Sequence, residues 1–180
     1  MIQADSGAAL RRALLIGSIG LIVGAVAWAH WPRSPLPEGT VADRVVVLKA
    51  ERRLELYDGA DLIRSYSVAL GREPVGSKRQ EGDKRTPEGT YTIDYRNPQS
   101  SFHLALHISY PRPDQVAAAV ARGVAPGGLV MIHGLPHGFR YVGRFHRLRD
   151  WTIGCIAVTN RKIEEIWRVV PDGTPIEIRS

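Results

Sequence analysis

The sequence contains a single cysteine, Cys155, in 180 residues. One thiol excludes a disulfide within the chain and a cysteine-rich metal site. HExxH motifs and carboxylate–histidine clusters are also missing, which makes zinc hydrolysis a weak hypothesis. No glycine-rich phosphate loop follows an expected strand, so nucleotide binding is weaker still.

Aromatic residues are few, at 7%, yet hydrophobic residues make up 44% of the chain. That share can build a core and excludes a disordered chain. The 18 glycines and 12 prolines are scattered without a period, which excludes collagen and favours a fold rich in turns. Acidic residues are outnumbered, 18 against 24 Lys and Arg, which leaves a net charge of +6. This excess favours an anionic partner, whether nucleic acid, acidic lipid or a wall polymer.

Charged residues are absent from residues 13–29, ALLIGSIGLIVGAVAWA, which follow Arg11 and Arg12. Basic residues ahead of an apolar run are typical of an export signal. The 17-residue run is intermediate between a signal core and a full membrane span of ~20 residues, and residues 27–29 have the small-x-small pattern of a cleavage site. Residues 1–30 are therefore expected to be a signal peptide or a membrane anchor, with both outcomes open. The protein should lie in the periplasm or cell envelope.

Residues 31–40 hold three prolines and one glycine, which predicts a stiff linker before a domain over residues 41–180. This domain is expected to be mainly β with short helices. Alternating and β-branched runs predict strands at residues 43–49, 53–57, 62–70, 90–95, 103–109, 128–133, 156–158 and 175–179. The short links between the first three strands predict an antiparallel meander. Residues 71–88 are interpreted as an exposed loop, and Asp114 and Asn160 as the N-caps of two helices. In the second helix the spacing i, i+3, i+4, i+7 predicts a buried face of Ile163, Ile166, Trp167 and Val170.

Cys155 lies in the segment TIGCIAVTN, directly after Gly154. In an exported protein a lone cysteine is either a buried apolar side chain or a reactive thiol. A glycine beside a nucleophile lets substrate approach the backbone, so that amide N–H groups can face a developing oxyanion. Cys155 is thus the candidate nucleophile, and a buried filler is the alternative.

A thiol nucleophile needs a base, and His133 is the best placed of the six histidines. It ends an expected strand and precedes Gly134, and strand ends are common places for catalytic side chains. A solvated turn histidine is the alternative. His137 and His146 fall in an expected loop and should matter less.

His103 and His107 stand four residues apart on an expected strand. On a strand this spacing separates them by about 13 Å, so chelation of one ion by both is not expected.

Two basic segments flank these candidates. Residues 78–85 mix basic and acidic side chains, which predicts a solvated loop. Residues 140–149 hold four arginines and no acid. Of these, Arg140 and Arg144 are candidates for binding carboxylates of a substrate. Nucleic acid is not expected as a partner, because an exported protein has little access to it.

The residues around His133 and Cys155 resemble the bacterial L,D-transpeptidases with a YkuD-type catalytic domain. The matching pieces are Ile132-His133-Gly134, then Thr152-x-Gly154-Cys155-Ile156, then Asn160, with 22 residues from His133 to Cys155. The resemblance extends over about residues 45–179.

This resemblance implies a mixed β-sheet sandwich and a peptidoglycan L,D-transpeptidase without metal or organic cofactor. Cys155 would take an acyl group from a stem tetrapeptide and pass it to an amine acceptor, a stem peptide or a wall-linked protein. His133 would be the base, and the Gly134 carbonyl would fix its tautomer. Thr152 and Gly154 would support the oxyanion region.

Two positions depart from the family pattern: Ile153 replaces a histidine and Ala157 replaces an arginine. Both positions are thought to shape the substrate and oxyanion region, and the arginines of residues 140–149 are one conceivable source of the missing charge. The alternatives are an L,D-carboxypeptidase or endopeptidase on peptidoglycan, and a non-catalytic wall-binding module.

Overall fold

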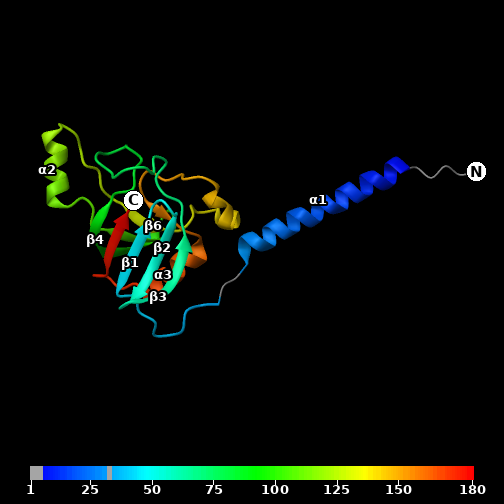
Figure 1. Ribbon diagram of the computed structural model, residues 1–180, viewed down its shortest axis with the longest axis horizontal. Helices are drawn as coiled ribbons and strands as arrows, with labels where there is room; N and C mark the ends of the chain where they lie inside the picture. Colours follow the sequence, from blue (N-terminus) through cyan, green and yellow to red (C-terminus); the bar gives the residue numbers. More distant parts are fainter. Residues whose placement is uncertain (1–5, 32–33) are drawn as a thin grey trace, which may run out of the picture. The chain divides into compact units, whose positions relative to one another are not determined.

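The computed structural model describes residues 6–31 and 34–180, which belong to two compact units, residues 1–34 and 35–180 (Figure 1). Residues 1–5 of the expected signal or anchor, and residues 32 and 33 of the expected linker, lie outside the described residues.

The first unit consists of helix α1, Ser6–His30 (Figure 1). Within it, residues Leu10–His30 are long and apolar enough to cross a membrane, and their side chains are almost all exposed. The helix is compatible with a signal and with an anchor.

The second unit is built on a mixed β-sheet, which confirms the expected fold class. Its strand order is β3-β2-β1-β8-β4-β5-β6-β7. The strands are β1 Arg44–Leu48, β2 Arg53–Asp58, β3 Asp61–Ser67, β4 Gly89–Ser100, β5 His103–Ile108, β6 Met131–His133, β7 Ile156–Ala157 and β8 Pro175–Arg179. The first three form the predicted antiparallel meander, visible side by side in Figure 1.

The long strand β4 joins the two halves of the sheet. Its first residues pair with β8 and its last with β5, and its pairing with β5 shifts register after Ile93. β6 continues from β5 in the antiparallel sense, and β7 pairs with β6 in parallel. Beyond β3, Ala69 pairs with Ala157 of β7, so the two edges of the strand order meet. This contact brings the segment after β3 next to the candidate nucleophile.

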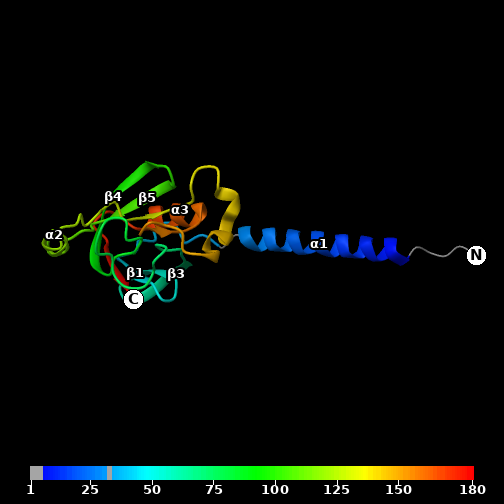
Figure 2. The same cartoon turned by 90° about the horizontal axis from the view of Figure 1, so that it is seen from above.

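Helix α3, Asn160–Val169, packs against β5 and β6, and Figure 2 shows it beside β5. Ile163 and Ile166 are buried with 0% exposure, as their helical spacing predicts, and Trp167 is partly buried against the same core. Val169, which the spacing did not indicate, is buried as well. The packing places the start of α3 behind the turn that follows His133.

Both predicted helix caps are wrong. Helix α2, Pro113–Ala121, has Arg112 as its N-cap residue, because Pro113 is well suited to the first helical position. The N-cap residue of α3 is Thr159. The side chain of Asn160 does not cap the helix; its Oδ1 accepts a hydrogen bond from the backbone amide of Leu135 at 2.9 Å.

Two predicted boundaries are also wrong. The strand expected at residues 128–133 begins only at Met131, because Leu129 has a φ of +52° that interrupts an extended chain. Part of the expected linker belongs to the domain: Leu36 is buried, and its amide donates to Glu165 at 2.9 Å. Arg168 binds the Leu36 carbonyl at 2.9 Å, so α3 fixes this end of the segment.

Candidate active site

His133 stands at the end of β6 and is 4% exposed. Its Nδ1 lies 2.7 Å from the carbonyl oxygen of Gly134. Burial lowers the pKa of His133 to about 4, although the Gly134 carbonyl acts in the opposite direction. The ring is therefore neutral at pH 7, with Nδ1–H donating to the carbonyl and Nε2 available as an acceptor.

The turn after His133 has no room for a larger residue than glycine. A Cβ at Gly134 would lie 2.9 Å from the Phe102 carbonyl oxygen and 3.0 Å from Asn160 Oδ1. The Phe102 and Trp151 rings pack against the imidazole, with centroids at 4.5 and 5.8 Å. These contacts fix both the backbone carbonyl that holds the tautomer and the ring itself.

The turn before Cys155 is held by Thr152. Its hydroxyl donates to the Cys155 carbonyl at 2.7 Å and accepts from the Gly154 amide at 3.1 Å. Gly154 has a φ of +134°, and a Cβ there would lie 2.7 Å from the Arg85 carbonyl oxygen. Thr152 and Gly154 therefore shape the turn before Cys155, and the Gly154 amide is already engaged.

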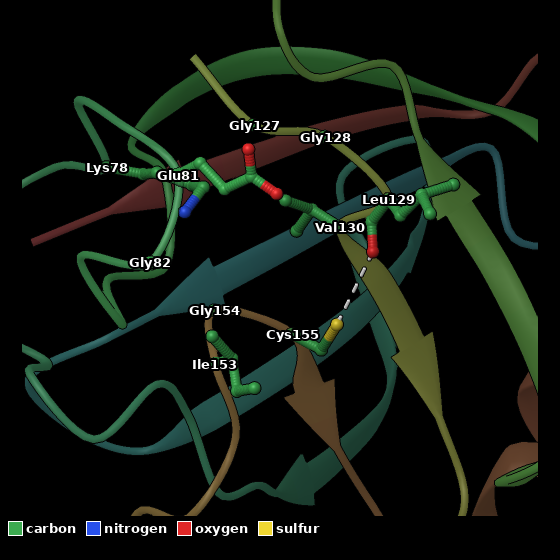
Figure 3. Close-up of a pocket in the computed structure, with 10 residues that line it drawn as sticks. All are labelled: Lys78, Glu81, Gly82, Gly127, Gly128, Leu129, Val130, Ile153, Gly154 and Cys155. Carbon is green, nitrogen blue, oxygen red and sulfur yellow. Dashed lines mark hydrogen bonds between the residues drawn. The ribbon is translucent and has the colours of Figure 1, made fainter. Parts of the chain in front are cut away.

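The Cys155 thiol lies 3.6 Å from the Leu129 carbonyl oxygen (Figure 3). Burial raises the pKa of this thiol, while the Met131 backbone and the positive charge of Lys78 lower it. The raised pKa leaves the group mainly as a thiol at pH 7, as a neutral partner for a neutral imidazole.

The parallel pairing of β6 with β7 brings the two candidates together. Ile132 pairs with Ile156 and His133 with Ala157. Cys155 directly precedes β7 and so begins the chain segment that runs along β6. Cys155 thus stands next to Met131, two residues before His133 on the neighbouring strand.

A pocket of about 150 Å³ opens on the thiol (Figure 3). It is lined by Lys78, Glu81, Gly82, Gly127, Gly128, Leu129, Val130, Ile153, Gly154 and Cys155. Neither Arg140 nor Arg144 is in this lining. Ile153 contributes an apolar side chain that is 67% exposed, and Ala157 is fully buried in β7.

Lys78 corrects the prediction of a solvated loop over residues 78–85. Its side chain is 4% exposed and its Nζ lies 2.9 Å from Asp83 Oδ1. Sequence reasoning missed this residue because alternating charges are usual on exposed loops. The closely spaced Lys78 and Asp83, among glycines, are the one local sign of a folded turn.

Residues 140–148 also differ from expectation, since they are not an irregular loop: element η1, Arg140–Leu148, consists of two short 3-10 helices that meet at a kink, where Gly143 has a non-helical φ of +52°. His146 on this helix is buried, and its Nδ1 accepts from Trp151 Nε1 at 3.5 Å. Burial, together with the charges of Lys162 and Arg147, lowers the pKa of His146 to about 3. Through Trp151, His146 belongs to the packing around His133.

Three further histidines bind separate partners. His103 Nε2 lies 2.7 Å from Glu164, His107 Nδ1 lies 2.6 Å from Asp94, and His137 Nε2 lies 3.0 Å from the Ser100 carbonyl. Within residues 6–31 and 34–180, no three His, Cys, Asp or Glu side chains are grouped to hold a metal ion.

The YkuD family model, which describes the L,D-transpeptidase catalytic domain, matches residues 42–178. The chain belongs to the L,D-transpeptidase family. A relative in Escherichia coli K12, named "Putative L,D-transpeptidase YafK", is 30% identical over 132 residues, which are 70% of this chain and 46% of that protein. This L,D-transpeptidase chain thus spans about half the length of that relative.

Solved structures show the same L,D-transpeptidase fold. The helical cell shape determining protein Pgp2 of Campylobacter jejuni superposes with a TM-score of 0.60 at 22% identity, covering 86% of this chain and 54% of that one. An L,D-transpeptidase from Mycobacterium smegmatis gives a TM-score of 0.52 at 15% identity, covering 77% of this chain and 59% of the other. At these identities the likeness concerns the fold alone.

Proposed function

We propose that the protein is a peptidoglycan L,D-transpeptidase that transfers an acyl group through Cys155. The observation that supports this most is the parallel pairing of β6 with β7, because it makes the segments that carry His133 and Cys155 neighbours, and Cys155 lines an open pocket. A thiol, a neutral imidazole and an accessible cavity are the requirements of cysteine acyl transfer.

In the first half-reaction, Cys155 Sγ attacks the carbonyl carbon of the amide that precedes the terminal D-amino acid of a stem tetrapeptide. His133 Nε2 takes the thiol proton as the S–C bond forms. Because Thr152 engages the Gly154 amide, the amide of Cys155 is our candidate for the oxyanion donor. The C–N bond then breaks, and His133 returns the proton to the leaving amine.

In the second half-reaction, the amine of an acceptor attacks the thioester carbonyl. His133 takes a proton from this amine, and the C–S bond breaks. The Cys155 sulfur is the leaving group and is protonated again. Water in place of the amine would give an L,D-carboxypeptidase, and attack on a cross-link would give an endopeptidase. A non-catalytic wall-binding module would need no reactive thiol.

We place the reaction in the cell envelope, with the domain exported by the apolar N-terminal helix. The length and composition of Leu10–His30 support insertion into the cytoplasmic membrane as signal or anchor. A positively charged exported domain is also suited to a polyanionic wall.

Incubation with a carbapenem tests the nucleophile without any assumption about the acceptor. The wild type should gain the mass of one inhibitor molecule in intact-protein mass spectrometry, and Cys155→Ala should gain none. Digestion of purified sacculi, with identification of the muropeptides formed, then distinguishes transfer from hydrolysis. A folded wild type that forms no adduct with the carbapenem and no products from sacculi would support the wall-binding alternative.

A further inference from the structure

Lys78 brings a buried positive charge to the pocket that opens on the Cys155 thiol. Its side chain is 4% exposed, a burial that is rare for a lysine without a partner. Figure 3 shows Lys78 and Glu81 entering the pocket from one side, with Gly154 and Cys155 facing them. Burial of a charge has a large desolvation cost, so the position of the Lys78 ammonium beside this pocket needs a physical reason.

The surrounding loop is built to hold the ammonium. Nζ donates to Asp83 Oδ1 at 2.9 Å and to the Gln80 carbonyl at 3.0 Å. The stem of the side chain runs past Gly127, where a Cβ would lie 3.3 Å from Lys78 Cε. Nζ itself lies 3.9 Å from the position that a Cβ would take at Gly154, the residue before the nucleophile.

The negative charge of Asp83 is shared among several donors. Its two oxygens also accept the backbone amides of Arg79, Gln80 and Arg85, at 2.7, 3.1 and 3.1 Å. A carboxylate that is stabilised by three amides neutralises a neighbouring cation less completely. Part of the positive electrostatic field of the Lys78 ammonium therefore extends into the pocket.

Few other charges face the thiol. The loop of residues 71–88 contributes Glu81, whose exposed carboxylate opposes Lys78, while His133 on the neighbouring β6 is neutral and does not line the pocket. Residues 127–131 and 152–157 are uncharged. Among the described residues that line the pocket, Lys78 is the one cation.

We infer that Lys78 is a positioning residue of the acyl transfer, whose positive charge stabilises the Cys155 thiolate against burial. The inference rests on the proposed role of Cys155 as nucleophile. Loss of the proton from Sγ to His133 or to water leaves a negative sulfur, and an ammonium held beside it lowers the cost of that step. Consistent with this role, the charge of Lys78 lowers the pKa of Cys155.

Alkylation by iodoacetamide measures the thiolate directly. The reagent is neutral, and Cys155 is the only cysteine in the chain, so the rate on full-length protein reports this thiol alone. For Lys78→Gln and Lys78→Met, we expect the rate at pH 7 to fall about tenfold and the pH midpoint to rise. Lys78→Arg should stay within about threefold of the wild type, because it keeps the charge.

Lys84→Met is the matched control, since it removes the same charge from the same loop at an exposed position outside the pocket. Its rate should equal that of the wild type. Asp83→Asn tests the same idea if the Lys78 variants misfold. Removal of the carboxylate charge should lower the pH midpoint of alkylation, the opposite of the change expected for Lys78→Gln. Near-UV circular dichroism checks that each variant is folded.

The inference is overturned if folded Lys78→Gln has the wild-type midpoint, or if Lys84→Met shifts it equally. Should the Lys78 variants unfold, an unchanged or raised midpoint in Asp83→Asn overturns it instead. The assay needs no peptidoglycan, so its outcome is separate from that of the proposed function, which fails when the wild type forms no acyl-enzyme.

Discussion

Burial sets the protonation of both candidate catalytic groups. It raises the pKa of Cys155 and lowers that of His133 to about 4, so the pair rests as thiol and neutral imidazole at pH 7. The thiol proton must therefore be removed when Cys155 reacts, which makes His133 a general base in the proposed reaction.

Replacement of His133 tests this assignment. We expect His133→Ala to lower kcat for stem peptide by about 10³-fold, because an unassisted thiol of raised pKa supplies little thiolate at pH 7. His137→Ala is the control, since His137 binds only a backbone carbonyl, and its rate should stay within about threefold. A dead His137 variant beside an active His133 variant would reverse the assignment.

The same buried histidine should make folding sensitive to acid. The folded-state pKa of about 4 lies below the unfolded value of ~6.5, so the unfolded chain binds more protons between these two limits. The free energy of unfolding should therefore be highest above pH 6.5 and fall by about 3 kcal/mol as the pH drops to 4.

Urea unfolding at pH 4.5, 5.5 and 7 measures this slope. His133→Gln should lose less stability over the same range, with the remaining slope coming partly from His146, whose pKa is lowered to about 3. Identical slopes for the two proteins would show that His133 does not titrate as described.

At the scale of elements, the site depends on the close approach of the turn at Gly154 to the loop of residues 71–88. We expect Gly154→Ala to lower the free energy of unfolding by about 3 kcal/mol, because it adds a clash with the Arg85 carbonyl to an unfavourable φ. Gly59→Ala is a matched control: its φ is +57°, but no atom lies within 4 Å of the new Cβ, so it should cost about 1 kcal/mol. Equal losses of unfolding free energy in the two variants, measured by urea unfolding, would show that the clash does not contribute.

Local patterns predicted some elements well. The meander of β1, β2 and β3 follows from alternation and short links, and the buried face of α3 follows from the spacing of Ile163 and Ile166. The cap predicted at Asn160 failed because its side chain binds the chain after His133, a contact that only the tertiary structure supplies.

Contacts between distant segments were beyond the reach of sequence patterns. The parallel pairing of β6 with β7 joins residues more than 20 positions apart through strands of three and two residues. The motif resemblance indicated His133 and Cys155, but no periodicity predicts which strand adjoins which. The burial of Lys78 likewise depends on Asp83, Gln80 and Gly127, which converge only after folding.

At the scale of the whole molecule, the apolar helix should direct the domain across the cytoplasmic membrane. A reporter that is active only in the cytoplasm, fused after Ser180, should be inactive in the full chain. The same fusion without residues 1–34 should be active, because the second unit, residues 35–180, contains the whole β-sheet. Full activity of the first fusion would contradict export.

The central claim is acyl transfer through Cys155, and mass spectrometry of products formed on purified sacculi tests it most directly. With wild-type protein we predict loss of the terminal D-amino acid from stem tetrapeptides and new links to an amine acceptor. Cys155→Ala should form none of these products, because nucleophile removal in such coupled sites costs on the order of 10⁴-fold or more. A folded Cys155→Ala that still processes stem peptides at the wild-type rate would contradict the account.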